Sequence, residues 1–387
     1  MALHTPCFIF DEAEFKNNIK NFKSVLEKYF HSSVIGYSFK TNSLPRLLQL
    51  VKENDCMAEV VSVDEYQLAV KIGFEKKNII FNGPVKEKKT FVDALKAGSL
   101  INIDSKREID WLLENKKPVE IGIRVNFDLE GKLPGQTSTG KQGGRFGFCY
   151  ENGELHKALV KLKEANIKVT RLHMHVSNAS KSVEVYECLA ATACQIIDEE
   201  QLDIDYIDFG GGYFGGGDNG QFYETYVSAI YNKLAEHGKE NTGIIVEPGA
   251  SIVATSFSYL TSVVDKKKTT YGNFVITDGT RLHIDPFMTK SNYNYCLLPD
   301  RKGMVSEQII CGYTCMEKDR ITTINAVEME IGDQIEYSVV GSYTMCFSAL
   351  FITYLPRVYS RVNNLEYILI REKWGVEEYI QKSRWEF

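Results

Sequence analysis

The sequence predicts a (β/α)8 barrel of the TIM type followed by a second, all-β domain. Two observations predict the barrel. Eight short apolar runs alternate with segments of helical periodicity between residues 34 and 246, and polar or glycine-rich motifs follow the ends of several runs. A third observation predicts the second domain, because strand-like runs continue after about residue 263 without comparable helices.

The predicted barrel strands are apolar almost throughout, which is typical of parallel strands covered by helices on both faces. They are residues 34–38, 57–61, 79–81, 100–103, 119–125, 169–175, 206–209 and 243–246. Apolar residues at helical spacing predict helices at 44–51, 66–73, 88–97, 107–114, 155–165, 183–200 and 222–237. An open sheet would gather its site at one switch point, so motifs after several strands favour the closed barrel.

The remaining strand-like runs predict the all-β domain. They are residues 257–264, 273–277, 309–313, 335–337 and 367–371. We therefore expect a barrel over residues 28–262 and a β-sandwich or Greek-key-like domain over 263–387.

Composition excludes several classes of protein. The 387 residues carry a net charge of −6 without a Lys/Arg-dense stripe, which argues against nucleic acid as the main partner. No apolar stretch approaches the roughly 20 residues that span a membrane. The first residues lack the features of a signal peptide, so we expect a cytoplasmic protein. The nine cysteines form no CxxC pair, which predicts reduced thiols and no metal site.

Lys40 stands at the end of the first predicted barrel strand. A buried ammonium group is costly unless it is paired or deprotonated. On this segment alone, a surface lysine is the simpler interpretation. The functional interpretation is a Schiff-base lysine, whose amine must be neutral to attack an aldehyde.

Three further motifs follow predicted strands. The triplet Gly210-Gly211-Gly212 allows backbone N–H groups to approach an anion, so phosphate binding is favoured over a flexible turn. Glu247 follows the last strand and can act as a general base, a metal ligand or the partner of a protonated ring nitrogen. His173 and His175 are two residues apart on a predicted strand and so share a face. They suit a metal pair, for which no third ligand is evident, or a ring packed on a planar cofactor.

Taken together, these motifs describe a pyridoxal 5'-phosphate site. The lysine holds the cofactor, the glycines hold its phosphate, and the glutamate keeps the pyridine nitrogen protonated. Each motif is weak alone, but the combination is specific.

The sequence resembles, almost end to end, the fold type III pyridoxal-phosphate enzymes that include the diaminopimelate, ornithine and arginine decarboxylases. The resemblance implies an alanine racemase-like barrel, a β-domain that also takes in residues 1–27, and a homodimer with shared active sites. The matching motifs are Lys40-Thr41-Asn42, Ser62-Val63-Asp64-Glu65, Arg124-Val125-Asn126, Arg145-Phe146-Gly147, His175-Val176, Gly210-Gly211-Gly212, Glu247-Pro248-Gly249, Cys315 with Asp319-Arg320, and Gly341-Ser342-Tyr343-Thr344.

The resemblance also implies a role for individual residues. Lys40, His175 and Cys315 form the implied catalytic set. His175 would stack on the cofactor ring, and Cys315 would reach the cofactor of the other subunit and donate a proton after carbon dioxide leaves. The implied cofactor contacts are Lys40, Arg124, His175, Asn178, Gly210, Gly211, Gly212, Glu247, Gly249, Ala250 and Tyr343.

Four positions depart from the family pattern. Ala250 replaces the Arg of Glu-Pro-Gly-Arg, and Asn178 stands at the Ser of His-x-Gly-Ser. Asp285 replaces the Arg of Ile-Arg-Pro, and the loss of a bidentate Arg weakens recognition of a buried carboxylate. Met316 replaces an acid that would meet a terminal ammonium group. The predicted substrate contacts are Asp285, Met316, Asp319 and Phe351.

We therefore expect decarboxylation of an α-amino acid that is not diaminopimelate, such as a modified, conjugated or carrier-linked amino acid of secondary metabolism. A racemase or epimerase on the same fold is the closest alternative. A catalytically inactive homologue that binds or regulates a true decarboxylase is another. A metal-dependent barrel hydrolase would need more His and Asp residues at strand ends.

Overall fold

The structure is a computed structural model that describes residues 3–114, 118–178, 180–363 and 366–385. The chain divides into two compact units, Asn17–Ile252 and Met1–Lys16 with Val253–Phe387. We call them the barrel unit and the β unit. The first division lies within helix α1 (Glu12–Tyr29), whereas the sequence analysis places it at residue 28.

Eight parallel strands close the barrel in the order β2, β3, β4, β5, β6, β8, β9, β10 and back to β2. Every predicted barrel strand is present, so the (β/α)8 prediction is confirmed. One detail is wrong, because the sixth barrel strand, β8, ends at His173 and His175 lies beyond it. The strands are β2 (Ser33–Ser38), β3 (Met57–Val60), β4 (Ile79–Phe81), β5 (Leu100–Ile103), β6 (Glu120–Asn126), β8 (Lys168–His173), β9 (Tyr206–Asp208) and β10 (Gly243–Val246).

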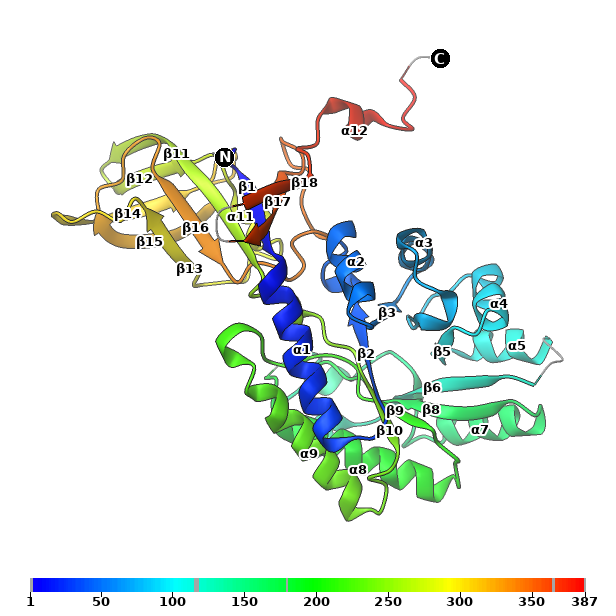
Figure 1. Cartoon of the computed structure of the whole chain (residues 1–387). Helices are drawn as coiled ribbons and strands as arrows, with labels where there is room; N and C mark the ends of the chain where they lie inside the picture. Colours follow the sequence, from blue (N-terminus) through cyan, green and yellow to red (C-terminus); the bar gives the residue numbers. More distant parts are fainter. Residues whose placement is uncertain (1–2, 115–117, 179, 364–365, 386–387) are drawn as a thin grey trace. The chain divides into compact units, whose positions relative to one another are not determined.

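Helices lie around the outside of these strands (Figure 1). The apolar strands are buried because the barrel interior covers one face and the helices cover the other. The helices are α2 (Pro45–Glu53), α3 (Val63–Ile72), α4 (Lys88–Lys96), α5 (Lys106–Glu114), α7 (Glu154–Glu164), α8 (Val183–Glu199) and α9 (Phe222–Glu236). Helix α1 was not predicted, although it buries Phe22 in a stacked contact with Tyr223 of α9, with ring centroids 4.3 Å apart.

The Ser62-Val63-Asp64-Glu65 motif has a local structural role. The Ser62 hydroxyl accepts a hydrogen bond from the Glu65 backbone N–H, and the Glu65 carboxylate accepts one from the Val61 N–H. These bonds satisfy donors at the start of α3 that would otherwise lack a partner. Gly73, with φ +97°, ends the helix in the left-handed conformation that glycine favours.

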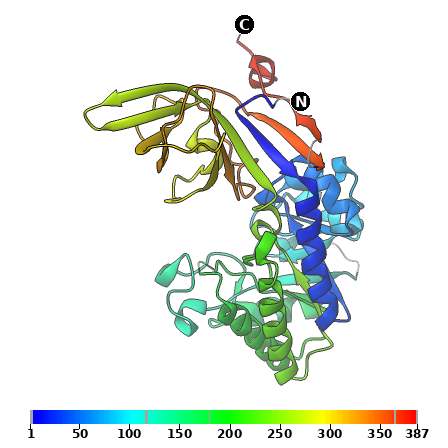
Figure 2. The ribbon, with the colours of Figure 1, turned by 60° about the vertical axis from the view of Figure 1, so that its left-hand side comes forward.

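The β unit is built on a nine-stranded sheet whose main order is β15-β14-β12-β11-β1-β17-β18. β16 pairs with β11 and β13. The N-terminal β1 lies between β11, to which it is antiparallel, and β17, to which it is parallel. Figure 2 shows β11 and β12 as a long hairpin. The strands are β1 (Cys7–Asp11), β11 (Phe257–Thr269), β12 (Gly272–Thr277), β13 (Asn294–Leu298), β14 (Val305–Cys311), β15 (Arg320–Val327), β16 (Gln334–Ser338), β17 (Arg357–Asn363) and β18 (Glu366–Arg371).

Strands β13, β15 and β17 were not predicted; β15 and β17 carry many polar residues, and β13 is short and mostly exposed. In β15 only Ile321 and Ile324 are buried, since the rest of the strand faces outward or is half-buried. The short elements of the chain are α6 (Leu129–Lys132), β7 (Phe148–Cys149), α10 (Ala250–Val253), α11 (Arg281–Ile284) and α12 (Val376–Ile380).

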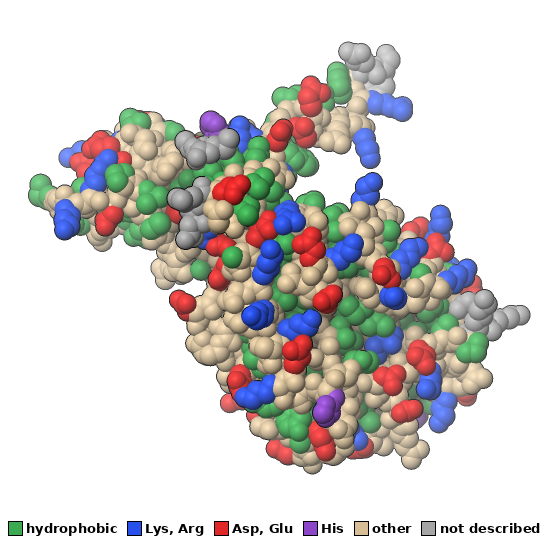
Figure 3. Space-filling view, in the orientation of Figure 1, with side chains coloured by type: hydrophobic (Ala, Val, Ile, Leu, Met, Phe, Trp, Pro, Cys, Tyr) green, Lys and Arg blue, Asp and Glu red, His purple; other side chains and the backbone are tan. Residues whose placement is uncertain are grey.

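Two features of the described residues bear on a membrane or nucleic-acid partner, namely the character of the helices and the distribution of charge. Among the described residues, none of the helices combines the length and the apolar character that crossing a bilayer requires. On the face drawn in Figure 3, acidic and basic side chains are interspersed. A cationic stripe of the kind that binds phosphate backbones is therefore not seen on that face.

A buried ion pair joins three elements of the barrel unit. Lys86, in the loop before α4, donates to Glu108 of α5 at 2.7 Å and to the carbonyl oxygens of Gly83 and Asn102 at 2.8 and 3.1 Å. Both charged side chains are fully buried. Burial lowers the pKa of Lys86, and Glu108 opposes that shift.

We predict that Lys86→Met lowers the free energy of unfolding by about 3–5 kcal/mol, because it leaves the buried Glu108 carboxylate without its cation. Lys88→Met is the matched control, because Lys88 pairs with Glu114 at the surface and should cost less than about 1 kcal/mol. Denaturant unfolding of both variants checks this, and equal losses would contradict it.

Candidate active site

The predicted cofactor-contacting residues of the barrel unit lie toward the carboxyl ends of its strands. Lys40 follows β2, Arg124 lies near the end of β6, His175 follows β8, the glycine triplet follows β9, and Glu247 follows β10. The carboxyl ends of parallel barrel strands meet at one rim, where barrel enzymes have their active sites. The fold therefore brings these residues to the same face of the barrel.

Lys40 forms an ion pair with Glu59, with Nζ 2.7 Å from Oε2. The Glu59 side chain is 1% exposed and also accepts a hydrogen bond from the Ser38 hydroxyl at 2.6 Å. Ser38 and Glu59 are paired residues of β2 and β3, so the sheet register places this acid beside the lysine. The sequence analysis missed Glu59, although an acid within an apolar strand is a signal of the same kind as Lys40.

Glu247 is buried, with an Oε2 3.5 Å from His173 Nε2 and an Oε1 2.6 Å from Asn82 Nδ2. Burial acts to raise its pKa, but His173 and Lys40 outweigh burial and hold the pKa well below the ordinary value. Asp208 shows the opposite shift, because burial and the neighbouring Glu247 raise its pKa well above the ordinary value. Of these two carboxyl groups, Asp208 therefore holds a proton more tightly and Glu247 gives one up more readily.

His173, Asp208 and Glu247 place one ligand atom each within 4.8 Å of the others. This supplies the third metal-ligating group that the sequence analysis did not find for the histidines. However, Asp208 accepts hydrogen bonds from the Gly210 N–H and from Asn102, and Asn82 donates to Glu247. These donors occupy carboxylate lone pairs that a metal ion would need, which favours a hydrogen-bonded cluster.

The glycine triplet packs where a side chain would collide. A Cβ on Gly210, with φ +63°, would lie 2.4 Å from the His175 ring, and one on Gly211 would lie 2.6 Å from the Glu247 carbonyl oxygen. The Gly211 N–H donates to His175 Nδ1 at 3.2 Å. The backbone of the turn thus packs directly against His175 and the Glu247 segment.

Gly249, Ala250 and Asn178 lie beside this turn or in the neighbouring loop. A Cβ on Gly249 would lie 2.0 Å from the Thr41 hydroxyl, so this glycine allows the Glu247 segment to approach the Lys40 segment. Ala250 begins α10. Asn178 bonds within its own loop, where Nδ2 donates to the Ser182 carbonyl at 3.2 Å.

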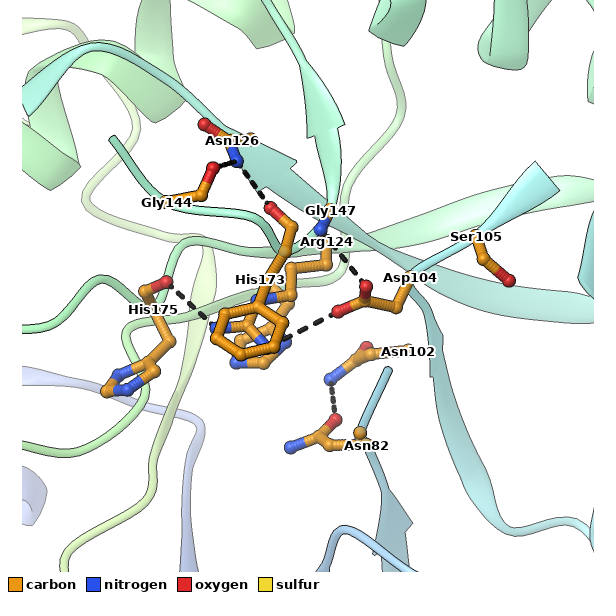
Figure 4. Close-up of polar contacts among 12 residues, drawn as sticks. Asn82, Asn102, Asp104, Ser105, Arg124, Asn126, Gly144, Gly147, His173 and His175 are labelled. Carbon is orange, nitrogen blue, oxygen red and sulfur yellow. Dashed lines mark hydrogen bonds and ion pairs between the residues drawn. The ribbon is translucent and has the colours of Figure 1, made fainter. Parts of the chain in front are cut away.

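Arg124 is fixed by its neighbours on the barrel strands. It donates to Asp104, at the end of β5, at 3.3 Å and to the His175 carbonyl oxygen at 3.4 Å (Figure 4). Asp104 also accepts from the Gly147 N–H at 3.1 Å. The Arg124 guanidinium lies 4.7 Å from the Phe146 ring centroid. Asp104 is a second acid that the sequence analysis missed.

His175 is held in its neutral form. Burial lowers its pKa well below the ordinary value, and the charges of Arg124, His173 and Lys40 lower it further. Its ring is nearly parallel to that of His173, with centroids 6.2 Å apart and an interplanar angle of 16°. A neutral, flat ring beside the glycine turn is suited to stacking on a planar cofactor.

The other predicted site residues belong to the β unit. Two of them, Asp285 and Asp319, accept hydrogen bonds from other residues of that unit. Asp285 accepts two hydrogen bonds from Arg281, at 2.8 and 3.0 Å, and one from the Tyr293 hydroxyl. Asp319 accepts hydrogen bonds from Thr280, Thr314 and the Arg281 N–H. Their predicted contacts with substrate remain predictions.

Cys315, Met316 and Phe351 are not buried, and Cys315 is an exposed free thiol. Tyr343, with φ +63°, lies in an aromatic cluster whose ring centroids are 6.3 Å from Phe287 and 5.9 Å from Phe347.

Comparison with known proteins identifies the family. The sequence profile described as "Pyridoxal-dependent decarboxylase, pyridoxal binding domain" matches residues 12–254. The chain belongs to the pyridoxal-dependent decarboxylases. It is therefore a pyridoxal-phosphate enzyme of the carboxy-lyase class, as the sequence analysis predicts.

Relatives within the family are diaminopimelate decarboxylases. The chain is 28% identical over 353 residues to that of Helicobacter pylori, which covers 88% of this chain and 85% of that protein. It is 26% identical over 290 residues to the probable chloroplastic enzyme of Oryza sativa subsp. japonica, covering 72% of this chain. The match covers 58% of the rice protein, less than two thirds of its length.

A solved structure confirms the fold. The diaminopimelate decarboxylase of M. jannaschii in complex with L-lysine superposes with a TM-score of 0.88 and 22% identity, covering 99% of this chain and 92% of that one. A barrel plus a separate, mostly β domain is therefore confirmed.

The residues at the barrel rim fit pyridoxal phosphate. They supply a lysine amine, a neutral flat ring, an ionised buried glutamate and a turn whose packing excludes side chains. The Arg124 Nε and the His173 Nδ1 are buried without a hydrogen-bond partner among the described residues. A polar ligand at this rim is consistent with these donors and acceptors.

The neutral His175 ring gives a prediction for stability against pH. The folded pKa lies below the unfolded value, so its contribution is present above about pH 6.5 and is lost as the pH falls. Between pH 6.5 and 5.5 the wild type should lose up to about 1.4 kcal/mol more unfolding free energy than His175→Gln.

Denaturant unfolding at each pH checks this prediction, with the exposed His237→Gln as control. The control should follow the wild type. Parallel curves for the wild type and His175→Gln would contradict a half-buried ring that is held neutral.

Proposed function

We propose that this pyridoxal-phosphate decarboxylase acts on an α-amino acid other than diaminopimelate, with a modified, conjugated or carrier-linked distal end. One observation carries the proposal. Asp285 stands where the family resemblance leads us to expect an arginine. Its carboxylate accepts two hydrogen bonds from Arg281, four residues earlier in the chain.

The Arg281 guanidinium donates all of its described hydrogen bonds to residues of the β unit. Its Nε and Nη2 donate to Asp285, its Nη2 also donates to the Lys290 carbonyl at 2.8 Å, and its Nη1 donates to the Arg320 carbonyl at 3.4 Å. Hydrogen bonds from Arg281 and from the Thr289 and Lys290 N–H groups outweigh burial and hold the pKa of Asp285 below its ordinary value. A distal carboxylate on the substrate would meet this ionised acid, which disfavours its binding.

Met316 supports the same substrate class. Its thioether offers neither a charge nor a strong hydrogen bond, so it suits an apolar or neutral distal group better than a terminal ammonium. A modified or conjugated distal end has this character.

The residues of the barrel rim would act as follows. Bound pyridoxal phosphate supplies an electron sink for the electron pair released when the substrate carboxylate leaves as carbon dioxide. Lys40 would hold the aldehyde carbon of the cofactor, and Glu59 lies where it can take a proton from the amine. Glu247 would keep a proton on the ring nitrogen, because an ionised buried carboxylate favours a positive partner. His175 would cover one face of the ring.

We further propose a cytoplasmic homodimer in which Cys315 donates the proton that replaces the carboxylate. No disulfide joins the cysteines in the part of the chain that the structure describes, which suits a reducing compartment. The β unit exposes a run of large apolar residues that suits a contact with a second copy. They are Phe347, Leu350, Phe351 and Ile352, with Phe287 packed on Phe347.

For the reaction, we predict that the wild type releases carbon dioxide from amino acids with neutral or acylated distal ends, and that Lys40→Ala releases none. Lys71→Ala, at an exposed helix end, is the control and should keep wild-type activity. Carbon dioxide release and loss of chirality are measured together, since a racemase would show only the second. A higher kcat/KM for diaminopimelate than for every neutral-ended amino acid would contradict the substrate proposal.

For the shared site, we predict that Cys315→Ala lowers amine formation by about 10²- to 10⁴-fold, the usual contribution of a positioned proton donor. Mixed dimers of Lys40→Ala and Cys315→Ala should recover activity that neither variant shows alone, because one of the two sites is then intact. The measurement is activity of tag-purified mixed dimers. No recovery in confirmed mixed dimers would contradict sharing of sites between subunits.

A further inference from the structure

The Asn82 side chain lies at the centre of the buried polar cluster of the barrel. It follows β4, is 2% exposed, and its backbone N–H donates to the Val60 carbonyl at 2.8 Å. Its Nδ2 donates to Glu59 Oε1 at 3.0 Å and to Glu247 Oε1 at 2.6 Å. Its Oδ1 accepts from Asn102 Nδ2 at 2.9 Å, a bond drawn in Figure 4.

These bonds use both N–H donors of the carboxamide. Each goes to a different carboxylate, and the two carboxylates belong to strands that are not neighbours in the barrel. Glu59 pairs with Lys40, and Glu247 lies against His173. Asn82 is therefore the direct link between the lysine end and the ring-nitrogen end of the site.

We propose that Asn82 is a positioning residue that couples Glu59, the counterion of Lys40, to Glu247, so that one neutral amide orients both carboxylates. This inference rests on the pyridoxal-phosphate chemistry proposed above. The sequence analysis assigns no role to Asn82.

An amide suits this position better than a charged residue. Glu59 and Glu247 carry the same charge, and a hydrogen bond to the charged form of each carboxylate favours that form. A third acid here would add repulsion, and a cation would compete with Lys40. The amide donates to both carboxylates without adding a charge.

The surrounding elements hold the amide in one orientation. Asn102 of β5 donates to Asn82 Oδ1 and to Asp208 Oδ2, so Asn82 must turn its Nδ2 toward the two glutamates. Asn102 in turn fits because Gly122 of β6 has no side chain. A Cβ there would lie 1.8 Å from Asn102 Oδ1. Three strands thus support the orientation of Asn82.

Several other charged groups act on the two carboxylates. Lys40, His173 and Asp208 act on Glu247, while Lys40 is paired with Glu59. Arg124 and Lys40 act on the adjacent His175. Loss of Asn82 removes a donor from both glutamates and leaves these charges in place, so the proton affinity of Glu247 should rise.

The test uses the cofactor-bound enzyme and two variants. Asn82→Leu keeps the volume and removes all three hydrogen bonds. Asn82→Asp keeps the shape but can donate at most one proton. We expect Asn82→Leu to weaken pyridoxal-phosphate binding roughly tenfold to a hundredfold, the range for hydrogen bonds to charged groups. The pH midpoint of the cofactor's absorption band should move by roughly one unit, the equivalent of a tenfold change in proton affinity.

Asn18→Leu is the matched control, because Asn18 is a fully buried amide of the same unit that donates to the Ile252 carbonyl at 2.9 Å. It should lower stability without moving the spectral midpoint. An unmoved midpoint in Asn82→Leu overturns the proposal, even with weaker binding, because a merely structural role gives that result. If Asn82→Leu does not fold, the midpoint of Asn82→Asp decides in the same way. A wild type that binds no cofactor would instead overturn the proposed function.

Discussion

The barrel unit depends on how it accommodates three carboxyl groups, Glu59, Asp208 and Glu247, in its buried interior. Removing a carboxylate from water is costly unless a cation or several hydrogen bonds replace the water. Here Lys40 pairs with Glu59, His173 lies against Glu247, and burial beside Glu247 raises the pKa of Asp208. Lys40 and Glu247 are groups to which the proposed chemistry assigns roles, so the contacts that allow burial of these acids also position the proposed active site.

The backbone of the rim is adapted to the same cluster. Gly210 and Gly211 approach His175 and the Glu247 segment more closely than any side chain would allow. The Gly210 N–H donates to Asp208, which links the start of the glycine turn to the buried acid. Asn82 and Asn102 connect the cluster across the barrel. A substitution at one strand end is therefore expected to alter the hydrogen bonds at the other strand ends, as in any shared polar network.

The sequence predicted the parts of this arrangement that depend on local pattern. Apolar runs alternating with helical periodicity located every barrel strand, and Lys40 and Glu247 stood out because each interrupts or ends an apolar run. Glu59, Asn82 and Asp104 were missed, since their importance comes from partners on other strands, such as Glu247, 165 residues from Asn82. The family resemblance assigned residues 1–27 to the β-domain, but it did not give the position of β1 between β11 and β17, because strand pairing across the length of the chain leaves no local signal.

The protonation of the buried cluster tests this account most directly. Infrared difference spectroscopy of the cofactor-bound enzyme can detect the carbonyl stretch of a protonated carboxyl group and assign it by substitution. The account predicts one such band from the cluster, lost in Asp208→Asn and retained in Glu247→Gln. A band that is lost in Glu247→Gln and retained in Asp208→Asn would contradict it.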